Sequence, residues 1–183
     1  MPESSEQKAR SRARIVEAAS RLFRGRGYRD TSVDDLMADA GLTRGGFYAH
    51  FESKAALLGA ALEAAFAESR RNLFEGRLAA LRGDAWRRAA SERYLSREHQ
   101  RRPEEGCAVP ALGAEVARAE PEVRDAFEAE VRAILDAMSE RLDGDRARAM
   151  RLLSTWVGAT LLSRAVHSPR LADAIRRAAR EAC

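Results

Sequence analysis

The chain has 183 residues, 45% of them hydrophobic and 33% charged, a composition ordinary for a globular protein of one large domain or two smaller ones. Runs of alternating valine, isoleucine and threonine are absent, which argues against a β fold and favours an all-α one. The longest apolar stretch, residues 152–166, is shorter than a membrane span, and the polar N-terminus lacks a signal-peptide core. We therefore expect a cytoplasmic protein without membrane contact.

Positive charge is concentrated near the N-terminus. Residues 1–29 contain eight lysines and arginines and three glutamates, a net charge of +5, whereas the net charge of the whole chain is +4. A basic segment on a near-neutral body is typical of a protein that binds a polyanion such as DNA. A solvated helix face with a basic tail would give the same pattern, so charge alone leaves both interpretations open.

In chain order, residues 1–9 are predicted to form a disordered basic tail, and apolar residues then repeat at helical spacing over residues 11–26. The next helix begins after Ser32, a good N-cap with Asp35 three residues on, as in a capping box. Gly41 ends this helix, and Thr43 precedes a second short helix over residues 44–50. Two short helices joined by a tight glycine turn form a helix-turn-helix arrangement.

Ser53 is the N-cap of a long predicted helix, residues 53–81, which joins an N-terminal domain (10–58) to a C-terminal domain (59–183). Five further helices are expected in the second domain, over residues 85–100, 107–119, 121–142, 145–167 and 169–182. Pro121 and Pro169 fit the first turns of their helices, where a missing N–H costs nothing.

Two local features of this part of the chain are unfavourable for helix stability and indicate another role. Gly45 and Gly46 should each cost about 1 kcal/mol relative to alanine, but they let a phosphate or base edge approach the backbone. Lys54 lies at a helix N-terminus, where the dipole disfavours a cation unless an anion fills the site. An ordinary exposed lysine is the alternative at that position.

Between Arg14 and Leu58 the chain carries a dense set of motifs: Leu22-Phe23, Gly27-Tyr28, Thr31-Ser32-Val33, Leu36, Ala40-Gly41-Leu42, Gly46-Phe47-Tyr48, His50-Phe51 and Ser53-Lys54. This run resembles the N-terminal domain of TetR-family repressors. The resemblance implies a homodimer whose two recognition helices enter successive major grooves of a palindromic operator. The residues that would contact DNA are Ser32, Thr43, Arg44, Gly45, Gly46, Tyr48, His50 and Lys54.

The chain departs from the family where Ala49 replaces a frequent aromatic residue and Gly46 replaces a frequent polar one. These departures leave fewer side chains for reading bases, so we expect Arg44 to carry much of the direct readout. Phe47 and Phe51 are expected to face inward and hold the helix in place.

The resemblance also implies a C-terminal domain with an inducer pocket and a dimer interface on the last two helices. The interface candidates are Leu153, Trp156, Val157, Thr160, Leu161, Arg164, Leu171 and Ile175, and intramolecular core is the alternative for each. The pocket candidates are Phe66, Trp86, Tyr94, His99, Cys107, Phe127 and Trp156, and plain core or surface is the alternative.

Cys107 is predicted to lie in the first turn of a helix, where exposed N–H groups would lower a thiol pKa. It would then sense oxidants or electrophiles, whereas a buried apolar role is the alternative. His99 and Cys107 are the only candidate base and nucleophile, and no acidic partner accompanies them, so we expect neither an enzyme nor a metal or cofactor site. An interaction module without DNA binding is a third interpretation.

The sequence therefore predicts a dimeric, DNA-binding repressor released by an unidentified small-molecule inducer. A thiol-based sensor acting through Cys107 is the alternative.

Overall fold

The computed structural model describes residues 5–183, so Met1 to Ser4 of the predicted tail lie outside the described part. The described residues form α-helices and short 3-10 helices without a strand, which confirms the all-α fold. In order, the elements are α1 (Ser5–Arg26), α2 (Val33–Asp39), η1 (Arg44–Ala49), α3 (Lys54–Phe74), η2 (Gly76–Leu78), α4 (Gly83–Tyr94), α5 (Arg97–Arg101), η3 (Pro103–Glu105), α6 (Ala108–Val116), α7 (Pro121–Arg141), α8 (Arg146–Ala165) and α9 (Pro169–Ala182).

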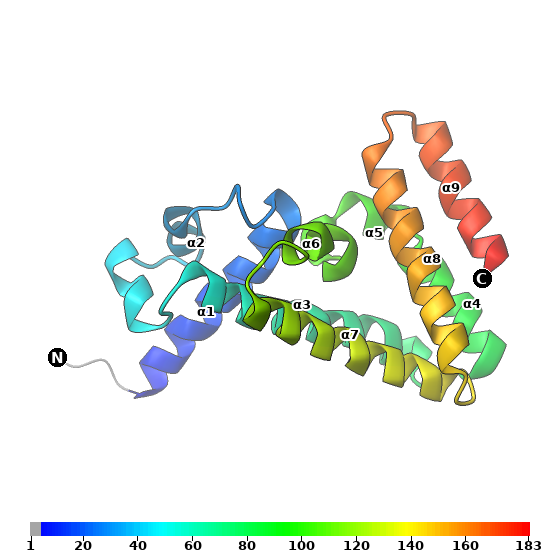
Figure 1. Cartoon of the computed structure of the whole chain (residues 1–183), viewed down its shortest axis with the longest axis horizontal. Helices are drawn as coiled ribbons and strands as arrows, with labels where there is room; N and C mark the ends of the chain where they lie inside the picture. Colours follow the sequence, from blue (N-terminus) through cyan, green and yellow to red (C-terminus); the bar gives the residue numbers. More distant parts are fainter. Residues whose placement is uncertain (1–4) are drawn as a thin grey trace.

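The molecule is elongated, with its two ends built from different helices. In Figure 1, α1, α2 and the blue-to-cyan segment after α2 form one end, which we call the head (residues 5–53). Helices α3 and α7 run side by side along the length, and α8 and α9 stand at the other end. Within residues 5–183, no helix combines the length and the apolarity needed to cross a bilayer.

Helix α1 is longer than expected and begins at Ser5, so residues 5–9 are helical rather than disordered. Glu6 lies in the first turn, where a negative charge is favourable, and its carboxylate lies 2.7 Å from the guanidinium of Arg10 one turn later. These two local effects extend the helix beyond the apolar stripe from which its start was predicted.

The turn between the two short helices follows the local signals. The Ser32 hydroxyl accepts a hydrogen bond from the Asp35 N–H at 3.1 Å, and the Asp35 carboxylate accepts one from the Ser32 N–H at 2.9 Å. This confirms the capping box. Gly41 then adopts a φ of +63°, which a residue with a side chain rarely takes, and the chain turns toward η1.

The segment after this turn is a 3-10 helix rather than an α-helix. Its i→i+3 bonds include the Gly46 N–H to the Thr43 carbonyl at 3.0 Å and the His50 N–H to the Phe47 carbonyl at 2.9 Å. Two consecutive glycines favour helix poorly, and a segment of six residues is short enough to keep this tighter winding.

Two predicted helices are interrupted. Helix α3 ends at Phe74 instead of residue 81, because Glu75 is extended and Gly76 has a φ of +58°. The predicted helix over residues 85–100 divides into α4 and α5, because the Ser96 hydroxyl caps a new helix by accepting from the His99 N–H at 3.1 Å.

One continuous core runs through both ends of the molecule. Phe23 of α1, Phe66 of α3, Trp86 of α4 and Trp156 of α8 are all fully buried within it. Because the head shares this core, its position depends on how α3 and α6 pack against α1.

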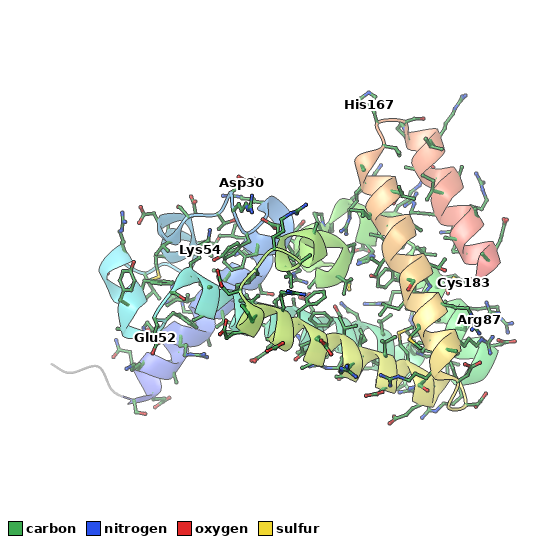
Figure 2. The ribbon with its side chains drawn as sticks, in the orientation of Figure 1. Asp30, Glu52, Lys54, Arg87, His167 and Cys183 are labelled. Carbon is green, nitrogen blue, oxygen red and sulfur yellow. The ribbon has the colours of Figure 1, made fainter. Side chains whose placement is uncertain are left out.

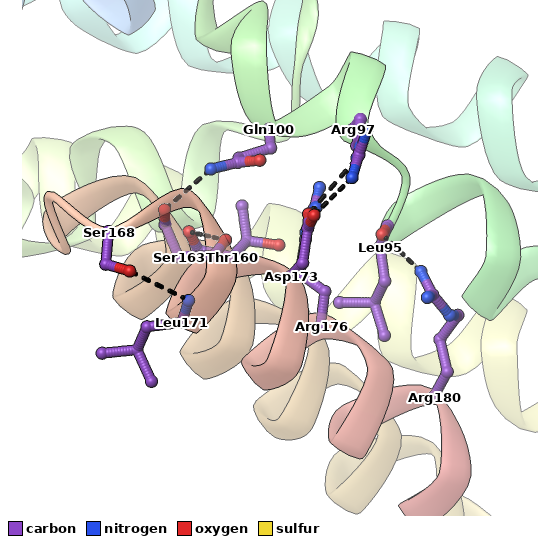
Figure 3. A network of polar contacts seen from close by, with 10 residues as sticks. All are labelled: Leu95, Arg97, Gln100, Thr160, Ser163, Ser168, Leu171, Asp173, Arg176 and Arg180. Carbon is purple, nitrogen blue, oxygen red and sulfur yellow. Dashed lines mark hydrogen bonds and ion pairs between the residues drawn. The ribbon is translucent and has the colours of Figure 1, made fainter.

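Helix α9 is fastened to the α4–α5 connection by polar contacts. Figure 3 shows the guanidinium of Arg97 facing the carboxylate of Asp173, and Arg180 donating to the Leu95 carbonyl, a bond of 3.0 Å. The side chain of Gln100 reaches the Ser163 carbonyl of α8 at 2.7 Å. These contacts fix α8 and α9 as a pair against α5.

Candidate nucleic-acid interface

The recognition segment, residues 43–51, has an inner and an outer side. Phe47 and Phe51 are buried, with ring centroids 6.0 Å apart. Tyr48 points the other way and is 72% exposed, with its ring edge-on to Phe47. The two phenyl rings anchor the segment in the head, so Tyr48 is presented to solvent on a rigid support.

Arg44 opens the segment and is exposed, with its guanidinium 2.9 Å from the Asp34 carboxylate. An ion pair between such exposed groups is weak, so the arginine is available for another anion. A side chain added at Gly45 would meet no atom within 4 Å, and one at Gly46 would lie 3.6 Å from the Met37 side chain. Packing does not require these glycines, and the open side of Gly45 leaves the backbone accessible to DNA.

Three further predicted DNA contacts differ in whether their side chains are already engaged within the protein. Thr43 is exposed at the N-cap position of η1 and makes no side-chain cap bond. Ser32 is also exposed, but its hydroxyl is engaged with Asp35. His50 is half-buried, and its Nδ1 atom has no hydrogen-bond partner among residues 5–183.

The side chain of Lys54, labelled in Figure 2, contacts the head itself. Its ammonium donates to the Tyr28 carbonyl at 2.5 Å and lies 4.2 Å from the centre of the Tyr28 ring. Desolvation lowers the pKa of Lys54, while the charges of Glu115 and Asp30 act in the opposite direction. The anion that the sequence analysis expected at this helix end is thus replaced by an internal carbonyl and an aromatic face.

A cavity of about 230 Å³ lies between α3, α4, α5 and the η3–α6 connection, and we call it the α3–α4 cavity. Most of its lining is polar, and three of the predicted pocket residues belong to it. The lining residues are Glu68, Ser69, Asn72, Leu73, Arg93, Tyr94, Ser96, Glu98, His99, Arg102, Glu105, Gly106 and Cys107.

Four predicted pocket residues are core instead. Phe66 and Phe127 pack edge to face with centroids 5.6 Å apart. The indole N–H of Trp86 donates to the Leu73 carbonyl at 3.0 Å, and Trp156 stacks on Tyr94 at 4.9 Å. These rings pack in or against the hydrophobic core and do not line the α3–α4 cavity.

His99 and Cys107 form a closed hydrogen-bonded unit at the cavity wall. His99 Nε2 accepts from the Cys107 backbone N–H at 3.0 Å, so its proton lies on Nδ1, which contacts the Tyr94 carbonyl at 2.5 Å. Burial, and next the positive charge of Arg164, lower the pKa of His99 to about 4. The histidine is therefore neutral at neutral pH and has no ring nitrogen left for catalysis.

Cys107 differs from the expectation of a reactive thiol. It is buried at the N-cap of α6, and burial raises its pKa. The helix N-terminus that the sequence analysis invoked is present, but loss of water outweighs it. The thiol is a packed apolar group in this structure, which favours the buried apolar role over the redox-sensor hypothesis.

The head is similar in sequence to a known protein family. Residues 15–61 match the model of the bacterial regulatory proteins of the tetR family. Over 60 residues the chain is 43% identical to the transcriptional regulator TtgR of Pseudomonas putida, and over 62 residues it is 39% identical to the repressor DhaR of a Mycobacterium species. These segments cover 33% and 34% of this chain and 29% and 31% of those proteins, so the chain aligns with less than a third of each.

Solved structures extend the likeness to the whole chain. SCO4454, a TetR-family regulator of Streptomyces coelicolor, is 28% identical, with a TM-score of 0.73 and coverage of 100% of this chain and 94% of that one. A TetR regulator of Chloroflexus aurantiacus is 26% identical, with a TM-score of 0.73 over 96% of this chain and 95% of that one.

The head of this chain belongs to the TetR family.

The TetR-family head is bonded directly to the cavity wall. Arg24 of α1 is buried; its Nη1 donates to the Gly106 carbonyl at 2.5 Å and its Nη2 to the Glu68 carboxylate at 2.7 Å. Gly106 and Glu68 both line the α3–α4 cavity. The side chain of Arg24 therefore joins α1 directly to two residues of the cavity wall.

A second link to the head starts on α6. The Glu115 carboxylate accepts hydrogen bonds from the N–H groups of Tyr28 at 2.9 Å and Arg29 at 3.0 Å. Sequence reasoning missed Arg24, Glu68 and Glu115. Only for Arg24 did the sequence indicate a buried position, since it follows Leu22 and Phe23 close to the apolar stripe of α1.

The predicted interface residues of α8 and α9 separate into two groups. Leu161 and Leu171 are exposed, and Val157 and Ile175 are half-buried. By contrast, Leu153, Trp156 and Thr160 are buried inside the subunit, and Arg164 donates to the His99 carbonyl at 2.7 Å and the Gln100 carbonyl at 3.1 Å. These four are intramolecular, because α8 packs against α6 and α7 on its inner side.

Proposed function

We propose that the chain is a transcriptional repressor that binds a palindromic operator as a homodimer and leaves it when a small molecule occupies the α3–α4 cavity. The two-sided recognition segment carries the DNA-binding part of the proposal. Its inner rings are fixed in the core, and its outer side offers a cation, a phenol and an open backbone position. The site of action would be the cytoplasm, and the protein would have no catalytic role.

Arg44, Tyr48 and Thr43 would enter the major groove, with the backbone at Gly45 and Gly46 close to the DNA. An arginine suits the acceptor edge of a guanine, and a tyrosine ring suits a thymine methyl group or a phosphate. Ser32 and His50 would contact the flanking backbone. Lys54 is left out of this set, because its ammonium is already engaged with Tyr28.

The proposed dimer interface is formed by exposed apolar side chains at the end of the molecule opposite the head. Of the five exposed large hydrophobic residues among residues 5–183, four lie on α8 and α9: Met150, Leu161, Leu162 and Leu171. Large apolar side chains left exposed on two neighbouring helices are typical of protein interfaces. Pairing these faces from two subunits would set the spacing of the two recognition segments.

Release would use the bonds between the cavity and the head. A ligand that moves Glu68 or Gly106 changes the partners of Arg24, and through them the position of α1. Such a ligand favours a conformation whose recognition segments no longer match successive major grooves.

An electrophoretic mobility-shift assay with DNA from the region upstream of the gene tests this function. The wild-type protein should bind with a steep salt dependence, and Arg44→Gln should weaken binding. Arg88→Gln removes the same charge from an exposed position of α4 and serves as the matched control. If the folded protein binds no duplex, or if both variants weaken binding equally, the proposal is wrong.

A further inference from the structure

The α3–α4 cavity is polar, and the hydrogen bonds already made by its lining indicate what a ligand must supply. His99 has used both ring nitrogens, and the Ser69 hydroxyl donates to the Ala65 carbonyl at 3.0 Å. These side chains have no donor left to offer. The remaining donors of the lining therefore decide which ligands fit.

The carboxylates of the lining are each paired with an arginine. Glu68 lies 2.7 Å from Arg24, while Glu98 and Glu105 both pair with Arg102. Arg93 of α4 is different, because among residues 5–183 it has no carboxylate partner. Its guanidinium donates only to the neutral side-chain oxygen of Asn72, at 2.7 Å. Arg93 is thus a cation of the lining without a carboxylate partner among residues 5–183, whereas Glu98 and Glu105 share the single guanidinium of Arg102.

The hydroxyl of Tyr94 is a second donor of the lining, and it faces only a weak acceptor. The residue is 4% exposed, and its hydroxyl lies beside the Cys107 thiol, a weak hydrogen-bonding group, without another partner among residues 5–183. A buried hydroxyl without a good partner is destabilising, and a ligand oxygen would remove this cost. Burial holds the pKa of Tyr94 well above its usual value, so the hydroxyl keeps its proton and acts as a donor.

From these contacts we infer that the ligand of the α3–α4 cavity is a small organic acid. Its carboxylate lies on the Arg93 guanidinium and the Asn72 amide, and a second acceptor oxygen at its far end takes the Tyr94 hydroxyl. A volume of about 230 Å³ admits a single-ring or short-chain acid. The inference rests on the proposed function, because it names the class of molecule that would release the operator.

The arginines around His99 are consistent with an acidic ligand. Arg164, Arg24 and Arg93 all act to lower the pKa of His99, so the potential at this end of the cavity is positive. Arg93 is the one of these three arginines that lines the cavity, and its charge attracts a carboxylate and repels a cation.

Isothermal titration calorimetry on the full chain tests the class of ligand with matched probes. The acids are 4-hydroxybenzoate and 4-oxopentanoate, and their primary amides have the same shape without the charge; 4-hydroxybenzylamine carries the opposite charge. The acids should bind, and the amides and the amine should bind at least about tenfold more weakly. Arg93→Gln and Tyr94→Phe should each weaken binding of 4-hydroxybenzoate by about tenfold, whereas Arg88→Gln should not.

Failure of both acids to bind at millimolar concentration, or equal binding of an acid and its amide, overturns the inference. Equal binding by wild type and Arg93→Gln also overturns it. The mobility-shift assay on the same preparation separates this failure from failure of the proposed function. Operator binding without acid binding rejects only the ligand class, whereas acid binding that leaves the operator complex intact rejects the proposed release.

Discussion

The guanidinium of Arg24 lies 2.7 Å from the carboxylate of Glu68, although the two residues are 44 positions apart in the chain. The arginine is almost fully buried, and about a third of the glutamate side chain is exposed. This ion pair joins the first helix of the head to the wall of the α3–α4 cavity. It links the two sites of the proposed function directly, and it also contributes to stability.

Arg24→Met should lower the free energy of unfolding by about 3 kcal/mol, because the Glu68 carboxylate and the Gly106 carbonyl lose their partner in a buried site. Urea denaturation at neutral pH measures the change. Arg10→Met is the matched control, since its ion pair with Glu6 is exposed and should matter little. Equal effects of the two substitutions would contradict the role given to Arg24.

Lys54→Met should destabilise the head by about 1–2 kcal/mol, because the Tyr28 carbonyl and ring lose the ammonium. The salt dependence of operator binding should keep its slope. If Lys54 instead contacts a phosphate, the slope falls by about one unit. Thermal denaturation and mobility shifts over a salt series thus distinguish the internal role from the DNA contact that the sequence suggested.

Stability should fall as the pH is lowered from about 6.5 toward 4, and His99 should be a main cause. Its folded-state pKa of about 4 lies below the ordinary value of 6.5, so the unfolded chain takes up the proton first. The contribution of His99 to the free energy of unfolding is complete above the unfolded-state pKa. It decreases by about 3 kcal/mol as the pH falls from the unfolded-state pKa to the folded-state pKa.

Urea denaturation across pH 4 to 7.5 measures this loss. His99→Gln should be less stable than wild type at pH 7.5 and should show a shallower dependence on pH. His167→Gln changes an exposed histidine at the turn between α8 and α9 (Figure 2) and should retain the wild-type slope. A wild-type slope in His99→Gln would show that other groups cause the loss.

Cys107 should react slowly with iodoacetamide at neutral pH. Burial raises its pKa and shields its sulfur, and both effects reduce the rate. Cys183→Ser leaves Cys107 as the single thiol, and mass spectrometry follows its alkylation in the folded and the urea-unfolded chain. The unfolded chain should react much faster. Equal rates, or peroxide-driven release of DNA that Cys107→Ser abolishes, would restore the thiol-sensor hypothesis.

Leu161→Glu should convert the protein to a monomer, because a carboxylate would be buried in the apolar α8–α9 interface. Analytical ultracentrifugation measures the mass. Tyr48→Glu changes another large exposed hydrophobic residue, in the recognition segment. This variant should remain dimeric while losing operator binding. A Leu161→Glu protein with the wild-type mass would place the interface elsewhere.

The head could be predicted from sequence because its signals are local. The capping box of Ser32 and Asp35 and the glycine turn at Gly41 depend on residues within a few positions of each other, and the structure contains both. The opposed directions of Phe47 and Tyr48 follow from helical spacing in the same way.

The cavity and the outward face of α8 could not be predicted, because they depend on distant residues. Arg24 and Gly106 are 82 positions apart, and no local pattern pairs them. Apolar residues surround α8 on most of its circumference, so Trp156 and Leu161 looked equivalent in the sequence. Only packing against α6, α7 and α9 turns Trp156 inward and leaves Leu161 exposed.

Gly106 has a consequence for sequence variation. A β-carbon at this position would lie 2.9 Å from His99 Nε2 and 3.1 Å from the Arg164 guanidinium. The imidazole cannot retreat, because hydrogen bonds hold both of its nitrogens. Evolution should therefore couple the two sites: a larger residue at position 106 becomes tolerable only after position 99 has become smaller. A paired mutational library of these two positions would recover Gly106→Ala chiefly in clones that also carry His99→Ser, His99→Gly or His99→Ala.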